Sequence, residues 1–226
     1  MAIRSIPLFP LNLVMLPKMI LPLHLFEERY TEMLEYCVDR ESPFGIVMLH
    51  GVDVTTGEPM YHSVGCTAEF VRVDPTKDGR YNVHVAGEER FRVLDTHDGM
   101  SFRMALVETF DDEPCDIDTL RPWTEKAGAL LTRFLEKHLS KSGEELGDVD
   151  LPDDPVILSF ACVCVVPVPI NKRQEMLELT DTLERLQIVC GWLSEAIERI
   201  DDPAPLVAAQ LRPMELVRFN RYHCSN

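Results

Sequence analysis

The sequence predicts an α+β protein in which a β-rich part is followed by a small helical part. In the first half, short apolar runs and runs that alternate between apolar and polar residues are separated by turn signals, a pattern typical of strands. In the second half, apolar residues recur every three or four positions, which is the spacing of one helix face. We therefore expect a β-rich subdomain over residues 1–115, a helical subdomain over residues 116–202 and a tail over residues 203–226.

The opening run, Ile6 to Leu34, combines aliphatic residues with four prolines. Because proline fixes φ and has no N–H, prolines so close together exclude a helix before residue 23 and predict short extended pieces joined by bends. These prolines are Pro7, Pro10, Pro17 and Pro22. The pattern then changes to a spacing of three and four, which predicts a helix over Glu27–Arg40 that plugs one open end of the strand structure. Its apolar face is expected to consist of Tyr30, Met33, Leu34, Cys37 and Val38.

Three further strands are predicted in the first half of the chain. Phe44–Leu49 is a short apolar run between a proline and a glycine, as expected for a buried strand. Tyr81–Leu94 alternates with a period of two, and Gly87 within it predicts a bend. Phe102–Val107 follows the turn signal at Asp98 and Gly99 and alternates in the same way. Short strands with turns at such intervals indicate a small barrel or a sandwich.

The second half begins with a long amphipathic helix over Leu120–Leu139. Asp154 followed by Pro155 is the combination of an N-cap residue and a proline at the first helical position. The run that follows, Val156–Val166, is apolar on all sides and fits a buried helix or a buried strand by periodicity alone. The start signal favours the helix.

Two more helices are predicted before the tail. Asn171 and Gln174 are expected to cap a short helix over Lys172–Leu179. Leu183–Ile200 places apolar residues alternately three and four positions apart, which gives a seam for packing against other helices. The tail after Pro203 is locally basic, unlike the rest of the chain.

Composition and charge narrow the class of protein. No segment approaches the roughly 18 unbroken apolar residues of a membrane span, and the N-terminus lacks the apolar core of a signal peptide. Seven cysteines, an odd number without regular spacing, fit reduced thiols, so we expect a cytoplasmic protein. The net charge of −16 disfavours nucleic acid and anionic membranes as partners, because binding to phosphate groups depends on Lys and Arg.

Several motifs follow one another in an order that resembles the N-terminal domain of Lon protease, in the form found in stand-alone bacterial Lon-domain proteins. They are IPLFPLNLVMLPKMILPLHLFEERYTEML, FGIVMLHG, VGCTAEFVRV, DGRYNVHVAGEERFRVL and DDPVILSFACVCVVPVPINKRQEMLELTDTLERLQIVCGWL. Together they cover roughly residues 3–200. The resemblance implies a PUA-like pseudo-barrel followed by a small helical bundle. It also implies a region that, in full-length Lon, recognises and helps to position substrate proteins.

The sequence also departs from full-length Lon. It contains no Gly-x4-Gly-Lys-Ser/Thr loop to cradle nucleotide phosphates, and the matched region is not followed by a protease domain. Asn12 and Leu13 replace an Arg-Asp pair that is often seen in full-length Lon. We therefore expect neither ATPase nor protease activity from this chain, no enzymatic function, and no cofactor or metal.

The resulting hypothesis is a non-catalytic protein-binding or peptide-binding module that acts as an adaptor or a chaperone-like factor. Its expected partners are unfolded or extended polypeptide segments and a separate ATPase or protease. The candidate peptide-binding residues are Leu13, Met15, Leu16 and Met19, because flexible, polarisable methionines in an exposed patch adapt to varied peptides. The alternative reading is that both faces of this proline-rich ribbon are covered.

Two other functions remain open from the sequence. Cys66 with a nearby histidine, of which His62 is the closest along the chain, is the candidate for a cysteine-based enzyme. Arg90 and Arg92 flank Phe91 on a strand, an arrangement that could contact RNA through a PUA-like surface, although surface ion pairs are the simpler explanation.

A cluster of cysteines in the second half is not expected to bind a metal. Cys162 and Cys164 are two positions apart and, on a helix, point about 200° apart. Together with Cys190 they are expected to be buried small apolar residues.

Overall fold

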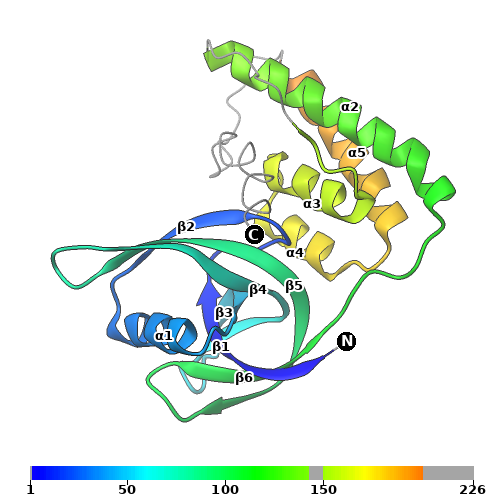
Figure 1. Ribbon diagram of the computed structural model, residues 1–226. Helices are drawn as coiled ribbons and strands as arrows, with labels where there is room; N and C mark the ends of the chain where they lie inside the picture. The colour runs from blue at the N-terminus through cyan, green and yellow to red at the C-terminus, as the bar shows by residue number, and fades with distance from the viewer. Residues whose placement is uncertain (1, 143–149, 201–226) are drawn as a thin grey trace. The chain divides into compact units, whose positions relative to one another are not determined.

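The computed structural model describes residues 2–142 and 150–200. These residues form two compact units, one over residues 2–111 and one over residues 112–142 and 150–200 (Figure 1). The predicted tail over residues 203–226 lies outside the described residues.

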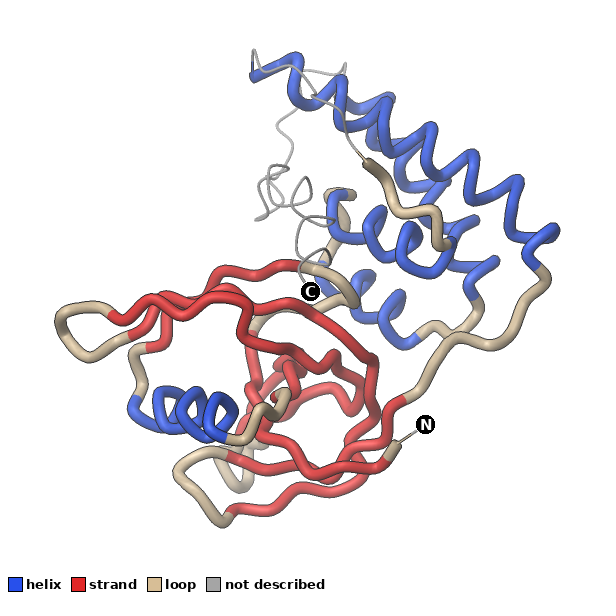
Figure 2. The backbone as a smooth tube through the Cα atoms, in the orientation of Figure 1, coloured by secondary structure: helices blue, strands red, loops and turns tan. Residues whose placement is uncertain are grey.

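The first unit contains six strands and one helix (Figure 2). They are β1 (Ile3–Leu11), β2 (Ile20–Leu25), α1 (Glu28–Asp39), β3 (Phe44–Val52), β4 (Pro59–Pro75), β5 (Tyr81–Asp98) and β6 (Arg103–Thr109). The strands form one sheet in the order β2-β5-β4-β3-β1-β6, and β5 also pairs with β6. The predicted helix and the strands beginning at Phe44 and Tyr81 are therefore present, and the strands extend further than their patterns suggested.

The sheet curls into a ring that is complete at one end and interrupted at the other. Along one edge β5 pairs with β4, and along the opposite edge it pairs first with β2 and then with β6. β6 also pairs with β1, which completes the ring at that end. Among the described residues β2 pairs with β5 alone, so no strand joins β2 to β1 at the other end. The result is a pseudo-barrel with one gap.

The core of the first unit follows the alternation that the sequence predicts. Val83 and Val85 of β5 are buried, as the period of two requires. A tightly packed cluster links β1, β3, β5 and β6; it consists of Ile6, Leu8, Val47, Phe91, Ala105 and Val107. On α1 the predicted face is buried at Met33, Leu34 and Cys37 but not at Val38, which is exposed.

Gly87 lies where the bend in β5 was predicted, and its lack of a side chain is essential. The Gly87 N–H donates to the Met19 carbonyl (2.9 Å), and the Lys18 N–H donates to the Gly87 carbonyl (2.8 Å). A Cβ at this position would lie far inside the contact distance of the Leu16 carbonyl oxygen. The chain between β1 and β2 therefore passes directly over β5 at the one residue that leaves room for it.

The second unit consists of helices α2 (Ile117–Ser142), α3 (Pro155–Val165), α4 (Ile170–Glu178) and α5 (Thr182–Ile200). Asp154 caps α3 as predicted: its carboxylate accepts from the N–H groups of Val156 (2.8 Å) and Ile157 (3.0 Å). The apolar run that follows is a buried helix and not a strand. The predicted cap at Asn171 is wrong. Pro169 precedes α4 without a side-chain cap, and the buried Gln174 donates instead to Glu178 (2.8 Å).

A buried ion pair organises the second unit. Arg185 of α5 is completely buried and pairs with Asp112, which lies just before α2 and is itself nearly inaccessible. The Arg185 guanidinium also donates to Ser159 Oγ of α3 (2.7 Å) and to the Leu179 carbonyl (2.7 Å), and it stacks over Phe160 at 4.1 Å. One side chain thereby connects α5 to α3, to the end of α4 and to the segment before α2.

Replacing Asp112 by asparagine should destabilise the protein strongly, because it leaves the Arg185 charge buried without its partner. We expect the free energy of unfolding to fall by about 3–5 kcal/mol, measured by urea denaturation. The control is Glu195→Gln, which removes the carboxylate of an exposed pair with Arg199 on the same helix and should cost no more than ~0.5 kcal/mol. Equal losses in the two variants would contradict the organising role of the buried pair.

Gly87→Ala should also destabilise the fold, since the new methyl group collides with the backbone at Leu16. We expect a loss of about 1–3 kcal/mol, as in other overpacked sites. Gly99→Ala is the matched control, because a Cβ there meets no atom within 4 Å. Thermal unfolding of both variants makes the comparison, and a Gly87→Ala protein as stable as the control would refute the close approach.

Candidate functional site

A cleft of about 600 Å³ opens in the first unit at the gap in the sheet. Its walls come from the end of β1, the end of β2, the start of α1 and the turn between β5 and β6. We call it the β1–β2 cleft and define it by Leu8–Leu11, Leu23–Phe26, the α1 residues Arg29 and Tyr30, and Met100–Arg103 from the β5–β6 turn and the start of β6. All of these segments belong to one unit, so the cleft is a property of that unit alone.

Aromatic rings line the inside of the β1–β2 cleft. Phe9 of β1 is buried, and its ring centroid lies 4.1 Å from that of Tyr30 and 6.2 Å from that of Phe44. Phe102 is buried as well and meets the ring of Tyr36 edge-on at 5.4 Å. Because these rings hold one another in place, the apolar lining is formed before any ligand arrives.

Two large apolar side chains of the cleft are exposed. Phe26 connects β2 to α1 and has 61% of its surface exposed, and Met100 lies in the β5–β6 turn and has 48% exposed. Exposed apolar side chains that line a concave site are typical of an interaction surface. Neither residue was singled out from the sequence. The only signal for Phe26 is an aromatic residue placed between a strand and a helix, where no core position is expected.

The charged groups of the cleft are largely compensated. Arg29 pairs with Glu27 (2.7 Å), and Arg103 pairs with Asp98 (3.2 Å). The Ser101 hydroxyl donates to Glu32 of α1. The α1 residues that line the cleft are Arg29 and Tyr30, whereas the acidic residues Glu28, Glu35 and Asp39 of this helix do not line it. Such a site favours a ligand that is mainly apolar.

The predicted peptide-binding residues are mostly not at the surface. Met15, Leu16 and Met19 have only 1%, 1% and 5% of their surfaces exposed, and Leu13 is half-buried. Leu16 and Met15 instead lie against Gly87 of β5. The structure therefore corrects the idea of an exposed methionine patch and matches the alternative in which the ribbon is covered. A binding role for Leu13, Met15, Leu16 and Met19 stays a prediction.

Cys66 is not set up as a nucleophile. Its side chain is fully buried in β4, and burial raises the pKa of its thiol, which keeps the thiol protonated at neutral pH. His62 lies four positions earlier on the same strand, about 13 Å away at the rise of an extended chain. The His62 ring instead meets the ring of His50 at 5.0 Å.

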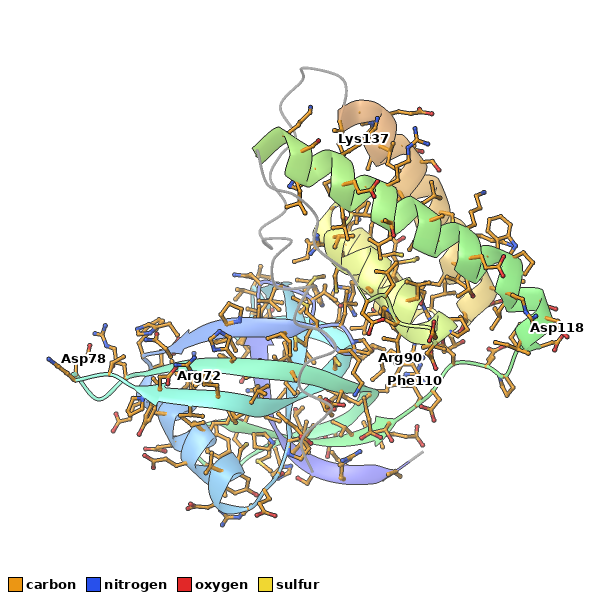
Figure 3. All side chains as sticks on the ribbon, turned by 45° about the horizontal axis from the view of Figure 1, so that its top comes forward. Arg72, Asp78, Arg90, Phe110, Asp118 and Lys137 are labelled. Atoms are coloured by element: carbon orange, nitrogen blue, oxygen red, sulfur yellow. The ribbon has the colours of Figure 1, made fainter. Side chains whose placement is uncertain are left out.

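Arg90 and Arg92 do not form an exposed array for RNA. Arg90 is buried, and its guanidinium lies 4.6 Å from the centre of the Phe110 ring; Arg92 lies over the same ring at 5.4 Å (Figure 3). Phe91, which points the other way, is part of the core cluster of the first unit. Both arginines therefore stack on an aromatic ring of their own unit.

The cysteines of the second unit are buried as predicted. Burial raises the pKa of the Cys162 thiol and raises that of Cys164 to about 12. Within residues 2–142 and 150–200, no group of three or more His, Cys, Asp or Glu side chains is arranged to hold a metal ion. In the same part of the chain, no helix is both long enough and apolar enough to cross a membrane.

Comparison with known proteins relates the chain to Lon proteases. The model of the family described as the ATP-dependent protease La (LON) substrate-binding domain matches residues 5–195. The Lon protease of Paraburkholderia phytofirmans is 28% identical over 196 residues, which cover 83% of this chain and 24% of that protease. The chain spans about a quarter of the length of the curated relatives that it matches.

Two solved structures share the fold. One is the crystal structure of a Lon N-terminal domain protein from Xanthomonas campestris, with 24% identity, a TM-score of 0.61 and coverage of 84% of this chain and 98% of that one. The other is the N-terminal domain of a Mycobacterium avium complex Lon protease, with 17% identity, a TM-score of 0.60 and coverage of 85% and 99%. The predicted α+β class, a β-rich part followed by helices, is therefore confirmed.

The burial of the thiols gives a testable pattern of reactivity. Exposed Cys115 should react with iodoacetamide at the rate of an unstructured cysteine, whereas Cys37, Cys66, Cys162, Cys164 and Cys190 should react at least about 100-fold more slowly. Peptide mapping by mass spectrometry measures each position, and urea should equalise the rates. Fast labelling of Cys66 in the native protein would contradict its burial.

The same burial predicts how stability depends on pH. Thiols of the unfolded chain ionise near pH 8.5 while the buried thiols of the folded protein stay protonated, so the free energy of unfolding should fall above about pH 8.5.

Proposed function

Because this chain belongs to the LON substrate-binding domain family, we propose that it recognises extended, apolar segments of other polypeptides and holds them in the β1–β2 cleft. The observation that carries this proposal is the exposure of Phe26 and Met100 at the edge of a preformed cleft lined with aromatic rings. Exposed apolar side chains beside a concave aromatic lining are suited to burying the side chains of a partner.

The size of the surface suggests weak binding. Burying one large apolar side chain contributes about 1.5–3 kcal/mol, and part of this gain is offset by the ordering of the ligand. A segment held by two or three such contacts would have a Kd on the order of 10 μM to 1 mM. Binding of this strength allows a substrate polypeptide to be captured and then passed on.

In this proposal, the chain acts in the cytoplasm as an adaptor or a chaperone-like factor that uses this binding step. Support comes from the relatives, which are Lon proteases in which the matched part is a substrate-binding domain. The chain would deliver bound segments to a separate ATPase or protease and would perform no chemistry itself. The buried, protonated state of Cys66 is in line with this role.

Substitution of the two exposed cleft residues tests the proposal. The probe is a fluorescein-labelled peptide of seven residues, Arg-Val-Thr-Phe-Thr-Val-Arg, and fluorescence anisotropy gives its Kd. Phe26→Ser and Met100→Ser should each weaken binding by about 10-fold or more, because each removes a large apolar contact.

The chain offers a matched control for each variant. Ile3 is as exposed as Phe26 (61%) and Leu94 is as exposed as Met100 (48%), but neither lines the cleft. Ile3→Ser and Leu94→Ser should therefore bind the peptide as the wild-type protein does. If all four variants bind alike, or if no peptide binds measurably, the β1–β2 cleft is not the recognition site.

A further inference from the structure

We propose that the bound segment enters the β1–β2 cleft as an additional β-strand, which fills the gap in the sheet and pairs with the backbone of β2 at His24. This inference rests on the proposed function, since it specifies how the cleft holds a polypeptide. The occupant is an extended segment of another polypeptide chain, recognised mainly by its backbone.

The gap follows from the way in which β2 and β6 share one edge of β5. β6 lies beside the second half of β5 and is paired on its other side with β1 over Ile3–Pro7. β2 lies beside the first half of β5, and within residues 2–142 and 150–200 no strand pairs with its other side. The remaining part of β1, Leu8–Leu11, is paired with β3 on one side only. Residues of both unpaired edges line the cleft.

The direction of the backbone groups on β2 can be read from its pairing. The Met19 carbonyl accepts from the Gly87 N–H of β5, and backbone groups alternate between the two edges of a strand. The N–H and C=O groups of residues 21, 23 and 25 therefore point to β5. Those of Ile20 and His24, and the carbonyl of Pro22, point to the unpaired edge. His24 is the residue of this second set that lines the cleft, and it offers both a donor and an acceptor.

The same reasoning applies to β1. The Ala2 carbonyl accepts from the Thr109 N–H (2.9 Å), so the backbone groups of the even-numbered residues of β1 point towards the side on which β6 lies. Beyond Pro7, where the pairing with β6 ends, the same side of β1 faces the cleft. Pro10 thus directs its carbonyl into the cleft. Pro22 and Pro10 both place their missing N–H at an unpaired edge, which is where a strand tolerates proline. A ligand strand therefore meets the Pro10 carbonyl and a complete donor–acceptor pair at Leu8 on the β1 side, and a complete donor–acceptor pair at His24 on the β2 side.

The length of the cleft describes the ligand further. β1 contributes four residues to the cleft, and β2 contributes three that are followed by Phe26, which is about 13 Å of extended chain on each side. A strand of about four residues therefore fills it. Side chains of a strand alternate, and every second one can meet the aromatic lining.

A pair of substitutions at His24 tests the backbone contact on the protein side. His24→Pro removes the N–H that points to the cleft and leaves the pairing with β5 intact, while His24→Ala removes the side chain and keeps the N–H. With the peptide Arg-Val-Thr-Phe-Thr-Val-Arg, we expect His24→Pro to bind at least 10-fold more weakly than His24→Ala. Equal Kd values for two folded variants, as judged by circular dichroism, would overturn the inference.

Modified peptides test the same contact without changing the protein. A set of peptides carries one N-methyl group at each position in turn, which removes one N–H and leaves the side chains unchanged. We expect the losses in affinity to be uneven along the peptide, at least 10-fold at the position opposite His24 and smaller at its neighbours.

The outcomes separate the two proposals. If the peptide binds and the Phe26→Ser variant does not, but N-methylation has the same small effect at every position, the cleft recognises side chains and the strand model is wrong. If light scattering shows that a second copy of this chain fills the gap and excludes the peptide, the strand model with a foreign segment is also wrong. If no peptide binds at all, the proposed function itself fails.

Discussion

The architecture of the first unit depends on how β5 divides one of its edges between two strands. β2 takes the first half of that edge and β6 the second half, and the change occurs around Gly87. The chain can pass over β5 at this residue only because no side chain occupies the space beside the Leu16 carbonyl. This crossing places β2 against β5, and among the described residues no strand pairs with the other edge of β2. The β1–β2 cleft lies at this gap in the ring.

The second unit is organised by a different kind of constraint. Its helices bury apolar faces, which alone permits several arrangements of similar energy, but a buried guanidinium permits few. Arg185 requires the carboxylate of Asp112, the hydroxyl of Ser159 and the Leu179 carbonyl in fixed positions around it. Leaving any of these groups unpaired away from water is costly, and the need to pair them selects one packing. The contacts of Arg185 therefore constrain how α3, α4 and α5 pack together.

The two units also differ in what they expose. Apart from the exposed Cys115, the described cysteines of the second unit are buried. The polar side chains around Arg185 are buried as well, so the reactive groups of this unit are shielded from solvent. The first unit instead presents Phe26 and Met100 beside compensated charges. In the proposed mode of binding, these side chains supply apolar area and the strand edges supply hydrogen bonds to the backbone. Recognition through a backbone is tolerant of the sequence of the bound segment.

Local rules determined much of this protein from its sequence alone: the α+β class, the extended pieces among the prolines, the cap at Asp154, the seam of α5 and the bend at Gly87. Each of these depends on residues close together along the chain. The candidate site could not be found in this way. Met15, Leu16 and Met19 have the composition of an exposed patch, but whether they are exposed depends on β5, which lies far along the chain. Only the tertiary structure decided that they are covered and that Phe26 and Met100 are not, because burial is set by contacts between distant segments, whereas propensity and spacing report only on neighbours.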